Sequence, residues 1–171
     1  MQKNSKTKKM KIGDSGEKYI LNMINEKTDD VAINMNKIKN NYPVIDLVVL
    51  NKTSYKYYGI SVKAKKTTKA WPRVSGIKNK NQYIIFVDYY LKKSPDIYIL
   101  GYSAWITVLE TILPERNKKD PGAKIVDGAI EWHNFKNKNG KFVKRYRGSL
   151  IRPEEIKRYK DNWNVLPGVS G

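Results

Sequence analysis

The sequence contains no cysteine and only one histidine, His133, and these two shortages exclude several kinds of site. Without thiolates the chain cannot form disulfides, iron–sulfur clusters, zinc–thiolate sites or a cysteine nucleophile. A single histidine also excludes a histidine-rich metal site built by one chain. A metal ion bound by this protein is therefore expected to be a hard cation such as Mg²⁺, held by carboxylate oxygens.

Acidic residues are also few: 16 Asp and Glu stand against 34 Lys and Arg in 171 residues, which gives a net charge of +18. Apolar residues make up 40% of the chain, enough for a folded core, so the charge does not imply a disordered polycation. Lysine and arginine bind phosphates with release of condensed counterions. The expected partner is nucleic acid, most simply double-stranded DNA.

Long hydrophobic runs are missing as well. No apolar segment reaches the roughly 18 residues needed to cross a bilayer, and the basic N-terminus is not followed by the apolar core of a signal peptide. No basic amphipathic helix of useful length is visible either, so binding to an anionic membrane is not expected. We expect a cytoplasmic, nucleoid-associated protein that is not secreted.

The length of the chain predicts one domain. Residues 1–12 carry five lysines and almost nothing apolar, so they are expected as a flexible basic tail. Residues 13–171 are expected as the domain itself, with its core in 13–113 and a C-terminal extension in 114–171.

Hydrophobic periodicity predicts both helices and strands. The expected helices are 13–27, capped by Asp14 or Ser15, and 103–113, ended by Pro114, with a short last helix at 153–163. The expected strands are 31–35, 44–50, 55–64, 83–89 and 97–102. A basic, irregular connection is expected at 65–82, and a hairpin from 129–135 and 141–147. This order indicates a single α/β (α+β) domain.

One acidic residue, Asp46, interrupts an otherwise apolar strand. A buried carboxylate needs a cation or hydrogen-bond donors. Ser61 and Lys63 are two residues apart on the next expected strand and so share a face, and a hairpin turn at 51–54 would bring them to Asp46. Such a group suits phosphodiester cleavage: Asp46 holds Mg²⁺, for which Mn²⁺ can substitute, and Lys63 positions or helps to deprotonate the attacking water. The alternative is an ion pair with no catalytic role.

The chain resembles a known family through three motifs: Gly16-Glu17 in a helix, Pro43-x-x-Asp46 in a strand, and Ser61-Val62-Lys63 after a hairpin. In this order they resemble the PD-(D/E)xK nuclease superfamily, which includes many type II restriction endonucleases and the archaeal Holliday junction resolvases. The resemblance covers residues 13–102.

The resemblance implies a restriction-endonuclease-like fold, with a mixed central sheet flanked by helices and a core ordered helix–strand–strand–strand–helix–strand. It also implies Mg²⁺-dependent cleavage of DNA, either restriction-type or selective for a structure. On this basis Asp46 is a metal ligand, Lys63 is the catalytic lysine, and Glu17 is the additional helix acid and second metal ligand. A homodimer is expected if both strands of a duplex are cut.

Ser61 departs from the family pattern, which usually has Glu, Asp or Gln at this position. A hydroxyl brings no charge, so metal affinity is expected to fall, and Ser61 is expected to act as an auxiliary ligand or to position water. The replacement acid would be Glu17 or Asp88, because residues 47–87 contain no Asp or Glu. Two other functions stay open: a nuclease-fold protein that binds DNA or RNA without cleaving it, and a basic interaction protein whose Asp46–Lys63 pair is structural.

Two basic segments, each with aromatic residues nearby, suit a nucleic-acid groove, because lysines contact phosphates and aromatic rings contact bases or sugars. The first is the acid-free stretch, and the second could form the opposite wall. The predicted nucleic-acid-binding residues are Lys52, Lys56, Lys65, Lys66, Lys69, Trp71, Arg73, Lys78 and Lys80 in the first segment and Lys141, Lys144, Arg145 and Arg147 in the second.

Overall fold

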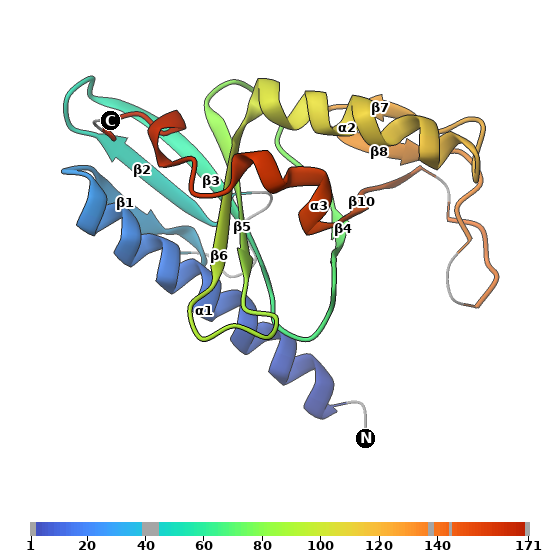
Figure 1. The fold of residues 1–171 in the computed structure, drawn as a ribbon, viewed down its shortest axis with the longest axis horizontal. Coiled ribbons are helices and arrows are strands. Elements are labelled where there is room, and N and C mark those ends of the chain that lie inside the picture. The colour runs from blue at the N-terminus through green and yellow to red at the C-terminus, as the bar shows by residue number, and fades with distance from the viewer. Residues whose placement is uncertain (1–2, 39–44, 137–138, 144, 170–171) are drawn as a thin grey trace.

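The computed structural model describes residues 3–38, 45–136, 139–143 and 145–169, and the side chains of helical residues from Ile12 onward (Figure 1). In chain order the elements are α1 (Lys3–Lys27), β1 (Val31–Asn34), η1 (Met35–Lys37), β2 (Leu47–Asn51), β3 (Lys56–Lys65), β4 (Trp71–Val74), β5 (Gln82–Asp88), β6 (Asp96–Gly101), α2 (Tyr102–Asn117), β7 (Lys124–Val126), β8 (Ala129–Trp132), β9 (Tyr146–Arg147), β10 (Ser149–Ile151), α3 (Pro153–Ile156), η2 (Lys157–Tyr159) and η3 (Trp163–Val165).

A mixed five-stranded sheet with the order β1-β2-β3-β5-β6 forms the centre of the fold. The first three strands form an antiparallel meander, β5 then pairs with β3 in parallel, and β6 pairs with β5 antiparallel. A parallel pair needs a crossover connection, and here that connection contains β4. Two smaller sheets complete the structure, β10 with β4 and β7-β8-β9. The expected mixed α/β architecture is confirmed.

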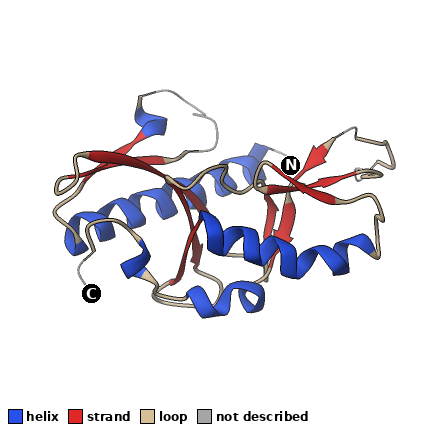
Figure 2. Ribbon diagram, turned by 90° about the horizontal axis from the view of Figure 1, so that it is seen from above, coloured by secondary structure: helices blue, strands red, loops and turns tan. Residues whose placement is uncertain are grey.

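Two hydrophobic cores fill the two faces of this sheet, and in Figure 2 its middle strands pass between the two long helices. On one face α1 packs Ile20 and Ile24 against Ile60 of β3 and its neighbours. On the other face α2 packs Trp105 and the rest of its apolar stripe over β5 and β6. The strands read as apolar runs because both of their faces are covered.

Helix α1 begins at Lys3, ten residues before the expected start. The helix thus includes most of the segment expected as a tail, and Asp14 and Ser15 lie within the helix and do not cap it. The physical reason is that no glycine or proline precedes Gly13, and lysine is a good helix former. The helix thus extends through a basic segment that carries no apolar stripe of its own.

Helix α2 continues through Pro114 to Asn117, although proline was expected to end it. The tertiary contacts of Arg116 explain this extra turn. Its Nη2 donates to the backbone oxygen of Leu150 and to Glu155, both at 3.1 Å. Fixing a buried guanidinium in this way offsets the cost of the proline, so packing overrides the local preference.

Three further boundaries differ from expectation. Asp46 lies just before β2 rather than within a strand of 44–50, and Pro43 and Val44 fall outside the described residues. The connection 65–82 includes strand β4, which forms because β10 supplies a partner far away in sequence. The last helix ends at Ile156 and is followed by two 3₁₀ turns.

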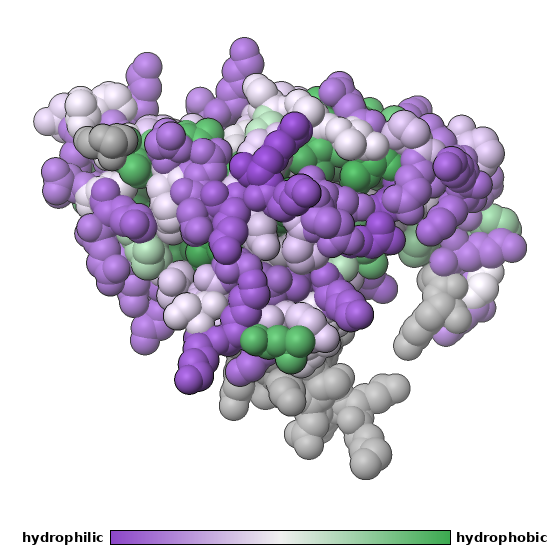
Figure 3. Space-filling model, viewed as in Figure 1, coloured by the Kyte–Doolittle hydropathy of each residue, from purple (hydrophilic) through white to green (hydrophobic). Residues whose placement is uncertain are grey.

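The surface shown in Figure 3 is mostly hydrophilic, with apolar residues gathered in small patches. Among the described residues, no helix has both the length and the apolar character needed to cross a membrane.

Two glycines of α1 provide a matched test of how the helix packs on β3. A Cβ on Gly16 would lie 2.6 Å from the Cβ of Ala64, whereas a Cβ on Gly13 would meet nothing within 4 Å. We expect Gly16→Ala to lower the free energy of unfolding by about 1–3 kcal/mol through overpacking. Gly13→Ala should raise it, by up to about 1 kcal/mol, because alanine has the higher helix propensity. Urea unfolding measures both, and equal stabilities would contradict the packing of α1 on β3.

Candidate active site and nucleic-acid interface

The alternation of side chains along β3 sets the geometry of the candidate site. Its residues Tyr58, Ile60 and Val62 belong to the core under α1, so Ser61 and Lys63 lie on the opposite face of the sheet. Asp46 joins that face from the neighbouring chain segment. Its backbone N–H donates to the oxygen of Ile60 at 2.9 Å, which places it at the end of the β2–β3 ladder, opposite Ser61.

Three groups contact one carboxylate oxygen, Oδ2 of Asp46. The backbone N–H of Val62 donates to it at 2.6 Å, the hydroxyl of Ser61 lies at 3.5 Å, and Nζ of Lys63 lies at 3.6 Å. Lys63 Nζ also donates to the oxygen of Val62 at 3.3 Å. The side chains of Lys63 and Asp46 keep 30% and 18% of their surface exposed. The structure thus brings Asp46, Ser61 and Lys63 together, with Ser61 buried and the other two side chains partly exposed.

Glu17 reaches this region from α1 and is held by two amides. Nδ2 of Asn34 donates to Glu17 Oε2 at 3.0 Å, and Nδ2 of Asn36 donates to both carboxylate oxygens at 3.0 and 3.1 Å. Burial raises the pKa of Glu17 above its usual value, the two amides oppose this, and the charges of Asp46 and Asp14 add to it. Asn34 pairs with Leu47, the residue after Asp46, so Glu17 and Asp46 are attached to neighbouring strands of the sheet.

The atoms that could hold a cation are all oxygens, which is the ligand type that Mg²⁺ prefers. Asp46 and Glu17 supply carboxylates, and Ser61 and Val62 supply a hydroxyl and a carbonyl. Within the described ranges, no group of three or more His, Cys, Asp or Glu side chains is placed to bind a metal. Mg²⁺ commonly uses one or two carboxylates together with water and substrate phosphates, so these residues fit such an ion only with those additional ligands.

Lys65 and Trp71 lie in the interior, and the prediction that they contact nucleic acid is wrong. Lys65 Nζ lies 2.7 Å from Oδ1 of Asp88, and their side chains are only 3% and 6% exposed. The ammonium also lies 4.6 Å from the ring centre of Trp71 and 5.4 Å from that of Tyr90. No described residue accepts a hydrogen bond of good geometry from it, so the ion pair and the aromatic faces stabilise it. Asp88 is therefore committed to Lys65 and is not a replacement acid.

The other basic residues of the acid-free stretch are exposed but lie at different places. Lys66 and Lys69 follow β3 at the end that carries Lys63. Lys52 and Lys56 lie at the β2–β3 turn, and seven residues of strand separate Lys56 from Lys63, roughly 23 Å. The remaining predicted residues of this stretch are Arg73 in β4 and Lys78 and Lys80 in the loop before β5.

The second basic segment is partly neutralised. Arg147 Nε donates to Glu131 and its Nη1 to Asp127, both at 2.8 Å, so it is engaged within the chain. Lys141 and Arg145 are exposed in the excursion between β8 and β9, and Lys144 falls outside the described residues. The expected hairpin is present, with β8 paired to β9, and β7 extends it to three strands.

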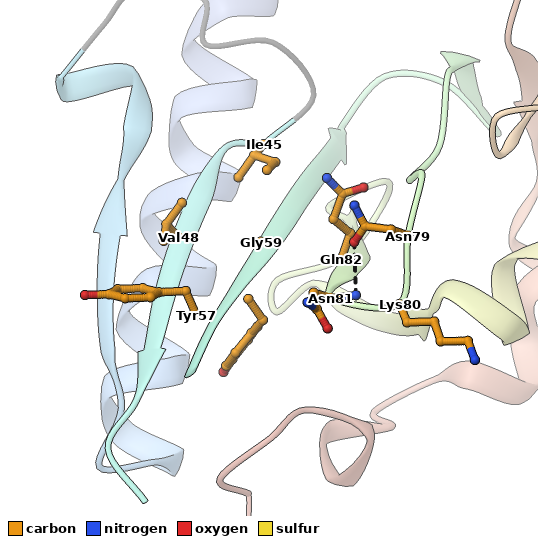
Figure 4. Close-up of a pocket in the computed structure, with 9 residues that line it drawn as sticks. Ile45, Val48, Tyr57, Gly59, Asn79, Lys80, Asn81 and Gln82 are labelled. Atoms are coloured by element: carbon orange, nitrogen blue, oxygen red, sulfur yellow. Dashed lines mark hydrogen bonds between the residues drawn. The ribbon is translucent and has the colours of Figure 1, made fainter. Parts of the chain in front are cut away.

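A groove of about 560 Å³ lies next to the candidate site, on the sheet face opposite α1 (Figure 4). Val48 of β2 and Gly59 of β3 pair directly, and Tyr57 lies one step further along that face. Ile45, the neighbour of Asp46 in sequence, closes the other end. Figure 4 shows Tyr57 lying across β2 and the residues of the loop before β5 on the other side of β3. The complete lining is Ile45, Val48, Tyr57, Tyr58, Gly59, Asn79, Lys80, Asn81 and Gln82.

Sequence reasoning missed the groove residues and the two amides that hold Glu17. The only sequence signal for the amides is that Asn34 and Asn36 flank Met35 at a spacing of two, at the end of an expected strand. The loop 79–82 has an unusual run of amide side chains but no pattern that would place it beside β3.

Comparison of the chain with protein-family models, with curated proteins and with solved structures finds no match. Any function assigned to the chain therefore depends on its own residues and their geometry.

The buried role of Lys65 can be tested against its neighbour. We expect Lys65→Met to lower the free energy of unfolding by about 3–5 kcal/mol, because it leaves the carboxylate of Asp88 buried and unpaired. Lys66→Met, at an exposed position, should change it by less than about 0.5 kcal/mol. Urea unfolding of the two variants checks this, and similar stabilities would indicate that Lys65 is a surface residue after all.

Proposed function

We propose that the protein is a Mg²⁺-dependent DNA endonuclease with its active site at Asp46, Lys63, Ser61 and Glu17. The observation that carries the proposal is the convergence of Lys63, Ser61 and the Val62 N–H on one oxygen of Asp46, whose side chain stays partly exposed. A purely structural ion pair would not require a second acid, and Glu17 is held by Asn34, which pairs with Leu47, the residue after Asp46.

The order of the elements supports the proposed restriction-endonuclease-like fold. A helix, an antiparallel meander of three strands and a fourth strand parallel to the third follow one another in α1, β1, β2, β3 and β5. The departure is in the crossover from β3 to β5, which contains strand β4 where the family would have a helix. The long helix α2 comes later, after β6, and covers the corresponding face of β5 and β6.

Asp46 and Glu17 would hold the Mg²⁺ ion, with Ser61 as an auxiliary oxygen ligand. When bound, the ion would polarise a phosphoryl oxygen and stabilise the charge of the transition state. Without a carboxylate at position 61 the site has one ligand charge fewer than the family pattern, so we expect weak metal affinity that increases when substrate phosphates are present.

The chain's own residues perform the remaining tasks of hydrolysis. Lys63 presents a half-buried ammonium to the phosphate, where it neutralises negative charge on the phosphoryl oxygens and positions the attacking water. The Val62 N–H fixes the orientation of the Asp46 carboxylate through its short hydrogen bond. Asn34 and Asn36 hold Glu17 in a single orientation and reduce the cost of its burial.

The charge of the chain supports DNA as the substrate. The net charge is +18, and residues 47–87, which surround the site, carry nine basic residues and no acidic one. Seven of these nine remain exposed, since Lys65 is buried and Lys63 is half-buried. Such a surface attracts a phosphate backbone by counterion release.

A second candidate function is a nucleic-acid-binding protein of the same fold without metal chemistry. The observation that favours it is the contact of Lys63 with the Asp46 carboxylate, because an ammonium can replace a metal ion as the counter-charge. The two functions differ in cleavage alone, so one assay separates them.

Nicking of supercoiled plasmid in Mg²⁺ or Mn²⁺ tests the endonuclease. We expect Asp46→Ala and Lys63→Ala each to lower the nicking rate by about 100-fold or more, because each removes a group that contacts the reacting phosphate or its counter-charge. EDTA should abolish nicking by the wild type.

Lys160→Ala is the matched control, because Lys160 also pairs with an aspartate, Asp96 at 3.0 Å, but lies far along the chain on the edge of β6. It should nick at the wild-type rate. Equal residual nicking by the wild type, Asp46→Ala and Lys63→Ala would reject the endonuclease and leave the binding protein.

A further inference from the structure

The groove beside the candidate active site has an aromatic platform that the mechanism does not use. Tyr57 is 62% exposed although it lies on a strand in the middle of the meander, where an apolar neighbour would normally cover it. It shares its face of the sheet with Val48 and Gly59, which form the floor of the groove (Figure 4). Glycine at position 59 leaves space in this part of the groove, since a Cβ there would lie 2.9 Å from Cδ1 of Ile45.

Opposite Tyr57, across β3, Asn79 in the loop before β5 and Gln82 at the start of β5 present amide side chains whose oxygens are already engaged. Asn79 Oδ1 accepts from the N–H of Asn81 at 3.0 Å, and Gln82 Oε1 accepts from the N–H of Lys78 at 2.7 Å. These bonds fix the amides, and their NH₂ groups donate to no residue that the structure describes. The groove therefore offers one aromatic face and two hydrogen-bond donors.

The charge around the groove indicates that its occupant is anionic. Every residue that lines it falls between 45 and 82, where Asp46 is the only acid, and Asp46 is neutralised by Lys63. Lys80 lies at the rim and Lys78 precedes it in the loop. A polyanion is thus favoured, and an aromatic face with amide donors is the combination that binds an exposed nucleobase by stacking and by its edge. A base paired inside a duplex does not offer its face.

We infer that the groove binds one unpaired nucleobase of the DNA substrate, stacked on Tyr57, with the amides of Asn79 and Gln82 across β3 available to the adjoining nucleotides. This inference rests on the DNA-binding part of the proposed function and names its substrate class, DNA with an unpaired nucleotide. Four residues of β3 separate Tyr57 from Ser61, roughly 13 Å, which corresponds to about four stacked nucleotides. The unpaired nucleotide therefore lies a few positions from the bond placed at Asp46.

Fluorescence anisotropy with two labelled duplexes tests the inference. The duplexes are identical except that one carries a single unpaired adenosine, and EDTA is present so that no divalent ion supports cleavage. We expect wild-type protein to bind the bulged duplex about tenfold more tightly than the paired one at the same salt concentration, as stacking on an aromatic ring predicts. Tyr57→Leu should reduce this ratio to about one, and Tyr57→Phe should retain it.

Tyr55→Leu is the matched control, because Tyr55 is two residues away and 81% exposed but does not line the groove. It should keep the wild-type ratio. Equal wild-type affinity for both duplexes, a full preference in Tyr57→Leu, or the same loss in Tyr55→Leu would overturn the inference and leave the groove to another occupant, such as a protein segment.

The outcome is independent of cleavage. Asp46-dependent nicking combined with no preference for the bulged duplex would retain the endonuclease and reject the nucleobase groove. A preference that depends on Tyr57, combined with no nicking, would do the reverse.

Discussion

The two-residue alternation of β3 is the constraint on which the rest of the structure depends. Because Ile60 and Val62 are buried under α1, Gly59, Ser61 and Lys63 must face the other way. That opposite face is covered by β4 and α2 near β5, but it is open over β2, where Asp46 joins it. One strand therefore supplies the core, the candidate catalytic group and the floor of the groove, and a shift of its register by one residue would reverse all three.

Several of the few acidic residues are engaged by partners within the chain. Asp30 accepts hydrogen bonds from Asn51 and Tyr58 and is thereby tied to the β2–β3 end of the sheet. Asp88 pairs with Lys65 in the interior, which removes both residues from the surface. What remains around the open face is positive charge with few counter-charges. The same distribution that stabilises the interior thus leaves the surface suited to a polyanion.

The groove lies beside the proposed active site on β2 and β3, while Lys63 lines a separate pocket at the end of β3. Ile45 lines the groove and Asp46 follows it directly, so a strand held at Tyr57 would lead towards Lys63. The loop before β5 contributes its amides because the parallel pairing of β3 with β5 brings Gln82 beside Gly59. A connection through β4, without a helix in the crossover, leaves this side of the sheet accessible.

The sequence by itself determined the class of the fold and the composition of the candidate site. Period-two and helical patterns predicted β3, β5, β6 and most of α1, and the spacing of Ser61 and Lys63 placed them on one face, because these features depend on neighbouring residues only. The tertiary structure alone decided which lysines stay in solvent, since Lys65 and Lys66 are adjacent in the sequence, yet Lys65 is the buried last residue of β3 and Lys66 follows the strand and is exposed. It likewise decided that α2 passes Pro114, that β4 forms against β10, and that Tyr57 faces an open groove. These outcomes depend on partners 20 to 80 residues away. Their burial and hydrogen bonds outweigh the local conformational preference, and no short stretch of the sequence includes both partners.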